Sequence, residues 1–288
     1  MKQSLRWHLA ASVLAAPAAA FAQTADGDGD SWSRRVAQAR ATQPEWSSPL
    51  VTTTALLEQR ARFDTAWQTV GNGTSTVNLG GGRGMDLILG ESQEVQIAED
   101  PFLTHDTPGG KGQYAGFADW PVLRFKQRLA SSPAGAGDYV VSTWLQAQVP
   151  SGIPQLGNHA YTLLPTLGAG KGWGPVVVQA TLGGVLPTAY QGRLGNQIVG
   201  NLALQYHAAG ILWPQIEVNW TSYQGGPRSG LNQVFLTPGL VVGKLALTQT
   251  LKFTCGVGYQ TALSPHFRAS PLTPAYDHAW LTTARISF

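Results

Sequence analysis

Residues 278–288 read His-Ala-Trp-Leu-Thr-Thr-Ala-Arg-Ile-Ser-Phe. Successive side chains of a β-strand point to opposite faces, so Trp280, Ile286 and the terminal Phe288 share one face and Arg285 lies on the other. A strand that is apolar on one side and charged on the other separates an apolar environment from a polar one. The stretch therefore predicts a β-strand whose two faces meet different solvents.

The aromatic residue at the end of this strand is a second signal. An alternating strand that ends on an aromatic side chain is similar to the assembly signal that the barrel insertion machinery of the bacterial outer membrane reads. We assign Trp280, Ile286 and Phe288 to this signal. The competing hypothesis, a soluble β-sandwich, gives no physical reason for a terminal Phe on the apolar face.

The same alternation recurs upstream, in segments of roughly ten residues that Gly, Pro, Asn or Asp separate. In 117–130, for example, Leu123 and Phe125 oppose Arg124 and Lys126. The expected strands are 56–69, 83–89, 93–102, 117–130, 139–149, 159–168, 176–186, 197–207, 211–222, 234–242, 245–259 and 278–288. An even number closes a sheet without an edge and leaves both termini on the periplasmic side, so we predict an all-β, antiparallel transmembrane β-barrel of about twelve strands.

The breaks between these segments alternate in length, as in outer-membrane barrels with long outer loops and short periplasmic turns. The long breaks are 70–80, 103–116, 150–158, 187–195, 223–231 and 260–276. The short breaks are 90–92, 170–174, 208–210 and 243–244, and 131–137 departs from the pattern. Aromatic residues near the strand ends fit the interface girdles of such barrels. They are Trp120, Trp173, Trp213, Trp220, Tyr223 and Trp280.

Composition agrees with this class. Only 12% of the residues are charged, about half of the usual share. The mean hydropathy is nonetheless −0.07, and beyond the first residues no apolar run reaches the ~18 residues of a membrane-spanning helix. Basic residues are scattered along the chain, so we expect no nucleic-acid partner.

The first residues have the features of an export signal. Lys2 and Arg6 precede an apolar stretch over 9–20, and Ala20-Phe21-Ala22 has the small-x-small pattern that signal peptidase reads. We therefore predict a signal peptide over 1–22, cleaved after Ala22, although an uncleaved anchor is the alternative. Residues 23–49 are expected to form a loose or briefly helical periplasmic lead-in, and 50–288 the barrel.

Charged residues on the polar phase of the strands are expected to face the lumen, where rings of fixed charge select solutes. The predicted pore-lining residues are Glu58, Arg60, Arg62, Asp64, Arg124, Lys126, Arg128, Glu217, Lys252 and Arg285. If the last strand pairs with the first, Arg285 and Lys252 approach Arg60 and Arg62. The carboxylates of Glu58, Asp64 and Glu217 then neutralise part of this positive charge. The alternative is a salt-bridged interior that fills the barrel.

Several stretches carry a family resemblance. They are 44–50 (PEWSSPL) with 57–60 (LEQR), 116–120 (GFADW), 179–187 (QATLGGVLP) and 234–240 (VFLTPGL). They resemble a family of outer-membrane β-barrel proteins labelled as transporters and related to the family named for the MetA pathway of phenol degradation. The resemblance covers nearly the whole mature chain and implies a barrel that passes small solutes, apolar or aromatic compounds among them. It implies no catalytic residue.

Three functions are therefore open: a passive channel, a non-conducting barrel whose loops bind a partner, and a membrane-embedded hydrolase. A hydrolase of this kind needs a Ser nucleophile and a His, but His105-Asp106-Thr107 carries Thr in that place. Cys255 is the single Cys, so no internal disulfide forms, and no metal-binding motif is present. We expect no enzyme, metal or cofactor, and as partners outer-membrane lipid, lipopolysaccharide, the barrel assembly machinery and a small-molecule solute.

Overall fold

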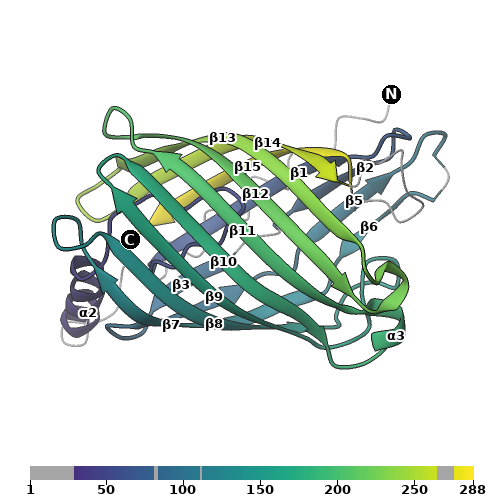
Figure 1. Ribbon diagram of the computed structural model, residues 1–288, viewed down its shortest axis with the longest axis horizontal. Helices are drawn as coiled ribbons and strands as arrows, with labels where there is room; N and C mark the ends of the chain where they lie inside the picture. The colour runs from purple at the N-terminus through teal and green to yellow at the C-terminus, as the bar shows by residue number, and fades with distance from the viewer. Residues whose placement is uncertain (1–28, 81–83, 111, 265–275) are drawn as a thin grey trace.

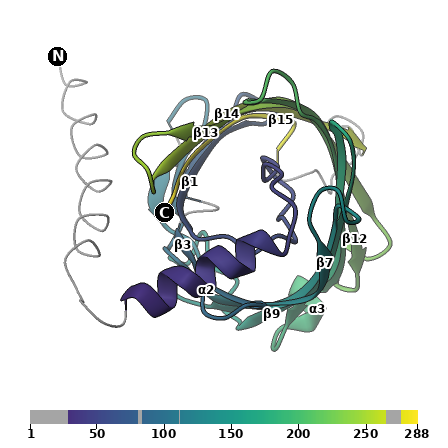
Figure 2. The same ribbon diagram turned by 90° about the vertical axis from the view of Figure 1, so that its left-hand side faces the viewer.

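The computed structural model describes residues 29–80, 84–110, 112–264 and 276–288. The predicted signal peptide and its cleavage site lie outside these residues. The described strands form one antiparallel sheet, which closes because β15 (His278–Ser287) pairs with β1 (Arg60–Thr69) (Figures 1 and 2). The predicted fold, a closed antiparallel barrel, is confirmed.

The sheet has twelve strand positions, three of which hold two short strands end to end. β2 (Ser75–Leu79) and β3 (Gly84–Ile88) share the position beside β1. The next two positions are shared by β4 (Gln93–Ala98) with β5 (Phe102–Asp106) and by β6 (Tyr114–Phe117) with β7 (Trp120–Ser132). The strands that complete the circle to β15 are β8 (Tyr139–Val149), β9 (Thr162–Trp173), β10 (Val176–Pro187), β11 (Asn196–Tyr206), β12 (Leu212–Gln224), β13 (Asn232–Ala246) and β14 (Lys252–Ser264).

The outer surface of the barrel is apolar and its interior is polar. On β11, Leu202 and Leu204 are about half exposed on the outside, while Gln205 is buried inside. The exposed outward side chains include Trp67, Ile97, Phe125, Leu145, Leu167, Leu182, Ile216, Val257 and Trp280. This is the distribution that a lipid-facing barrel requires. None of the helices among the described residues is both long and apolar enough to cross a bilayer.

Two of the expected short breaks are wrong. β9 continues through 170–173 and β13 through 243–246, where the glycines had indicated turns. Gly170 faces the lumen, and a Cβ atom there would lie 2.5 Å from a ring carbon of Trp46. Gly243 lies at a register shift between β13 and β14, which is a common position for glycine in a strand. These glycines make room or form a bulge, and they do not end a strand.

Several of the expected long breaks are shorter than predicted, because paired strands extend into them. β2 begins at Ser75, inside the expected break 70–80, and β14 runs to Ser264, inside 260–276. The β5–β6 hairpin occupies both ends of the expected break 103–116. Among the aromatic residues assigned to the interface girdles, Trp173 and Trp280 are 58% and 54% exposed on the outside. Trp213 does not belong there, since it is only 5% exposed and stacks on His207 at 4.1 Å inside the barrel wall.

The chain before β1 does not stay outside the barrel. Helix α2 (Gly29–Ala41) lies across the barrel end at which the C-terminus is found (Figure 2). It is a short polar helix, and the periplasmic location expected for residues 23–49 stays a prediction. Residues 42–59 then enter the barrel, and we call them the lumen segment (Figure 2).

The apolar outer surface generates a stability prediction. We expect Leu202→Arg, at the middle of β11, to lower the free energy of unfolding from phospholipid vesicles by about 2–4 kcal/mol, since an arginine on the lipid face is costly near the bilayer midplane. Urea titration of vesicle-inserted protein measures the change. Tyr190→Arg is the control, because Tyr190 is 59% exposed but lies outside the strands. Equal losses in the two variants would contradict the membrane placement.

Candidate functional site

The lumen segment fills much of the barrel interior. Trp46, Leu50, Leu56 and Leu57 are all no more than 6% exposed. The expectation that the first strand begins at Leu56 is therefore wrong, since β1 begins at Arg60. The side chain of Gln43 explains the difference, because it accepts from the backbone N–H of Leu57 at 2.9 Å and donates to its carbonyl oxygen at 2.8 Å. This contact takes the place of a strand partner.

Two apolar side chains of the lumen segment fit against glycines of the barrel wall. Trp46 lies over Gly170 and donates from Nε1 to the Asp138 carboxylate at 3.1 Å. Leu50 lies over Gly239 and Gly258, where added Cβ atoms would come within 2.4 and 2.7 Å of its Cδ1 atom. A larger residue at any of these positions would force the Trp46 or Leu50 side chain to move. Glycines in the barrel wall therefore leave the space that the Trp46 and Leu50 side chains occupy.

A carboxylate on β12 binds the backbone of the segment. Glu217 is fully buried and accepts from the N–H groups of Leu50, Val51 and Thr52 at 2.8, 3.0 and 2.6 Å. A hydrogen-bonded row of amide side chains extends from it across the wall. The row comprises Gln215, Gln205 and Gln179, with successive distances of 2.7, 2.9 and 2.8 Å from Glu217 onward. Three buried N–H groups without strand partners are thus satisfied by one anion.

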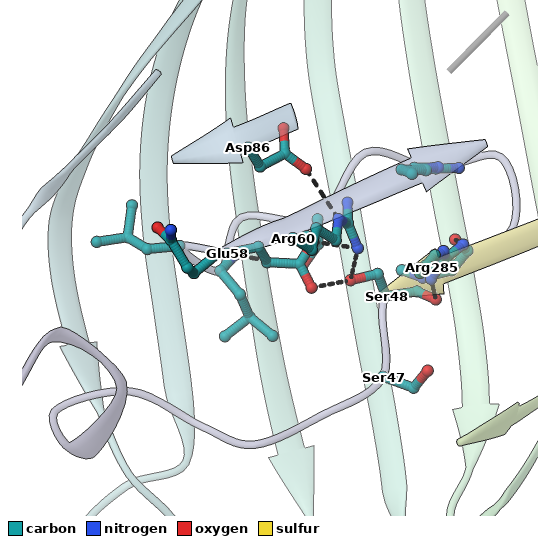
Figure 3. Close-up of polar contacts among 12 residues, drawn as sticks. Ser47, Ser48, Glu58, Arg60, Asp86 and Arg285 are labelled. Carbon is teal, nitrogen blue, oxygen red and sulfur yellow. Dashed lines mark hydrogen bonds and ion pairs between the residues drawn. The ribbon is translucent and has the colours of Figure 1, made fainter. Parts of the chain in front are cut away.

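Cationic side chains on the opposite wall bind the carbonyl groups of the segment. Arg285 donates to the carbonyl oxygens of Ser48 and Pro49, both at 2.6 Å (Figure 3). Arg62 donates to the carbonyl oxygen of Leu50 at 2.9 Å. Lys126 donates to that of Leu56 at 2.8 Å. The carbonyl oxygens of the lumen segment are therefore bound by cationic side chains, and its backbone N–H groups are bound by Glu217.

A continuous row of buried ion pairs crosses β1, β3, β4 and β7. Its members, in spatial order, are Glu58, Arg60, Asp86, Arg124, Glu94 and Lys126. Arg60 contacts both Glu58 and Asp86, the latter at 2.8 Å (Figure 3). Lys126 contacts Glu94 at 2.8 Å, and the same carboxylate accepts from the backbone N–H of Glu58 at 2.6 Å. Buried charges need such partners, because an unpaired ion is costly away from water.

The structure places most of the predicted lumen charges together. The expected pairing of the last strand with the first is confirmed, with Arg62 opposite Arg285, and Asp64 contacts Arg62 at 2.7 Å. Glu217 does not balance the arginines, because its carboxylate binds backbone N–H groups. Lys252 is exposed at the start of β14 and lies opposite Ser287, two strands from Arg60 and Arg62.

Arg128 lies nearer to α2. It donates to the carbonyl oxygens of Ala39 and Glu91 at 2.8 and 2.5 Å and to the side chains of Thr42 and Gln43. Whether the ten predicted residues line a solute pathway stays a prediction, as does the assembly role of Trp280, Ile286 and Phe288. Phe288 is held at the seam, since its carbonyl oxygen accepts from Arg40 at 2.9 Å and its N–H donates to Gln59 at 3.2 Å.

Two carboxylates of the ion-pair row, Asp86 and Glu94, are absent from the predicted set. Both lie in segments that were expected to be strands, and their inward phase was readable from the alternation in 83–89 and 93–102. The alternation there is weak because the strands are short and interrupted. Their cationic partners, Arg60 and Arg124, could have indicated that countercharges were needed.

The residues that suggested hydrolysis have structural contacts. The ring of His105 on β5 stacks on Tyr114 with centroids 4.5 Å apart, and Nδ1 lies 2.9 Å from the Thr76 hydroxyl oxygen. In the part of the chain that the structure describes, no three His, Cys, Asp or Glu side chains are grouped as metal ligands.

Two cavities lie in the barrel, one beside the lumen segment and one at the end away from α2. One, of about 270 Å³, borders the lumen segment at Leu50 and Val51 and is lined by Arg62, Arg124 and Tyr276 among others. The other, of about 310 Å³, lies among the connections at the barrel end away from α2. Its lining includes Asn158, Thr162, Arg193, Leu194, Tyr223 and Arg228. Solvent-sized space thus remains inside the barrel beside the segment.

The Glu217 contacts generate a testable prediction. In Glu217→Gln, the neutral amide accepts the three N–H groups more weakly, so we expect the local opening free energy of the lumen segment to fall by about 2 kcal/mol, or roughly thirtyfold in exchange rate. Amide hydrogen exchange at Leu50, Val51 and Thr52 measures the effect.

Asp119→Asn is the matched control for this variant. The Asp119 carboxylate also accepts backbone N–H groups, from Gly152 at 3.1 Å and Asn158 at 2.7 Å, but it does so in an outer connection. If the amide exchange rate at residues 50–52 rises equally in both variants, Glu217 does not specifically stabilise the bound lumen segment.

No protein-family model and no curated protein sequence matches this chain. Solved structures do match. An outer-membrane channel from Pseudomonas putida F1 superposes with a TM-score of 0.53 at 10% identity, over 84% of this chain and 98% of that one. The NanC porin gives a TM-score of 0.49 at 8% identity, over 79% and 98%. At these identities the likeness concerns the fold, which is the barrel of outer-membrane channels, and the resemblance to the MetA-related family stays an expectation.

Proposed function

We propose that this protein is an outer-membrane channel through which small solutes diffuse passively, and that the lumen segment closes it at rest. The observation that carries the proposal is the way the segment is held. Its backbone pairs with lumen side chains such as Glu217, Arg285 and Lys126, and it takes no part in the ladders of the sheet. The segment can therefore leave without breaking a single strand pair.

The polar lining supports a water-filled open state. Once the segment withdraws, the amide row and the ion-pair row meet water, so their hydrogen bonds are exchanged and not lost. The apolar outer surface stays in lipid throughout. In this arrangement the end that carries α2 and the C-terminus faces the periplasm, and the other end faces the medium. Export by a signal peptide over 1–22, residence in the outer membrane and contact with lipopolysaccharide and the assembly machinery belong to the same proposal.

A non-conducting scaffold is the second candidate. The buried ion-pair row from Glu58 to Lys126 favours it, because such a network also serves to fill a barrel. In that case the outer connections around Arg193 and Arg228 would bind a partner. The two candidates differ in one measurable property, which is current through the folded barrel.

Single-channel recording in a planar bilayer tests the proposal. We expect wild-type mature protein to give rare or small current steps, and Trp46→Ala/Leu50→Ala to give steps that are at least tenfold more frequent or longer. Each truncation removes an apolar contact with the wall that is worth about 2–5 kcal/mol. The matched control is Trp173→Ala/Leu163→Ala, which removes similar side chains that are 58% and 39% exposed on the outside.

The control should conduct as wild type does. If neither wild type nor the Trp46→Ala/Leu50→Ala variant carries current, although both are folded and inserted, passive diffusion through the lumen is wrong and the scaffold stands. Current that is equal in all three proteins would retain the channel but remove the lumen segment as its gate.

A further inference from the structure

The cavity beside the lumen segment has an unusual balance of charge. Its floor is formed by Leu50 and Val51, and the charged side chains that line it are Arg62, Arg124 and Asp64. Its volume, about 270 Å³, approaches the ~300 Å³ at which small-molecule sites begin. The rest of the lining includes side-chain amides, hydroxyl groups and several apolar residues, so a bound solute would meet both hydrogen-bonding groups and apolar surface.

Positive charge exceeds negative charge at this cavity. Asp64 is already paired with Arg62 at 2.7 Å. Arg285 lies behind them, opposite Arg62 in the barrel seam. Among the described residues no carboxylate lies within ion-pair distance of Arg285, whose guanidinium donates to Ser48 and Pro49 carbonyls and to the Thr283 hydroxyl. Arg62 and Arg285 thus lie side by side while only Arg62 is paired with a carboxylate of the described residues, in a place where water screens charge poorly.

Arg62 and Arg124 also have N–H groups without a hydrogen-bond acceptor in the described part of the chain. The Nε–H groups of Arg62 and Arg124 meet no acceptor among the described residues. The Nη2 group of Arg62 is divided between the Leu50 carbonyl oxygen, at 2.9 Å, and the Asp64 carboxylate. A neutral carbonyl accepts from a guanidinium more weakly than a carboxylate does.

From these contacts we propose that the cavity binds a small carboxylate solute, and that the bound carboxylate takes Arg62 from the carbonyl oxygen of Leu50. The inference rests on the proposed channel function and names a solute class for it. A planar carboxylate matches the guanidinium fork and binds it more strongly than a backbone carbonyl does. Because Leu50 belongs to the lumen segment, occupation of the site loosens the segment, and loosening the segment strengthens binding by the same factor.

Calorimetry on the mature protein in detergent micelles tests the site. Benzoate is the probe, and benzamide is its neutral counterpart of equal size. We expect wild type to bind benzoate at least tenfold more tightly than benzamide, and Arg62→Gln to lose that difference, since a charge-assisted hydrogen bond is lost. Asp64→Asn should bind benzoate several-fold more tightly than wild type, because the competing carboxylate is gone. This gain cannot arise from misfolding.

Arg193→Gln is the control, because it removes an equal charge from the outer cavity; its benzoate affinity should stay within twofold of wild type. Amide exchange at Leu50, Val51 and Thr52 should accelerate with benzoate and not with benzamide. Equal binding of the two probes, or unchanged affinity in Arg62→Gln, overturns the site. Benzoate binding without faster exchange overturns the competition for Arg62. Since calorimetry needs no conduction, a site that binds in a protein without current would refute the channel and leave the site intact.

Discussion

The pairing of β15 with β1 is the constraint on which the rest of the interior depends. This pairing closes the barrel, and its register sets Arg62 directly opposite Arg285. Neighbouring like charges in a strand pair are destabilising, so the seam needs acceptors on its inner side. Asp64 supplies one and the carbonyl groups of Ser48, Pro49 and Leu50 supply the others. Closure of the sheet thus creates the site to which the lumen segment binds, and the segment in turn relieves the repulsion that closure introduces.

The interior is organised as two walls of different chemistry. The wall around β1, β3, β4 and β7 carries the ion-pair row, while the wall formed by β10, β11 and β12 carries glutamines that end in Glu217. A peptide has both a donor and an acceptor at each residue, so it can be satisfied only by a lumen that offers both. This lumen does so on opposite sides. A polar, irregular segment can therefore be buried without secondary structure of its own, because its backbone groups have fixed partners in the wall.

Much of the fold was predictable because the lipid-facing phase of a strand is written in its own residues. The alternation of Leu123 and Phe125 with Arg124 and Lys126, for example, assigns the two faces of this strand without knowledge of its neighbours. The interior was less predictable, since its contents are set by contacts between segments far apart in the chain. The expected first strand includes Leu57, yet Gln43 binds the Leu57 backbone inside the barrel. Gly170 and Gly172 are expected in a turn because the sequence does not show that Trp46 packs against them.

The lumen segment is held by two kinds of contact. Hydrogen bonds to Glu217, Arg285 and Lys126 are exchanged for hydrogen bonds to water when the segment leaves, so each contributes about 1–3 kcal/mol. The buried side chains of Trp46 and Leu50 have no such replacement in water, and each contributes about 1.5–3 kcal/mol through burial alone. If the closed state is more stable than the open state by a few kcal/mol, the open state is populated at the level of about one per cent or below. A ligand that binds only the open arrangement needs a differential affinity of the same size to reverse that ratio. The glycine-lined wall and the polar side chains together set how firmly the barrel is closed, and the arginines beside the cavity set which solute can change it.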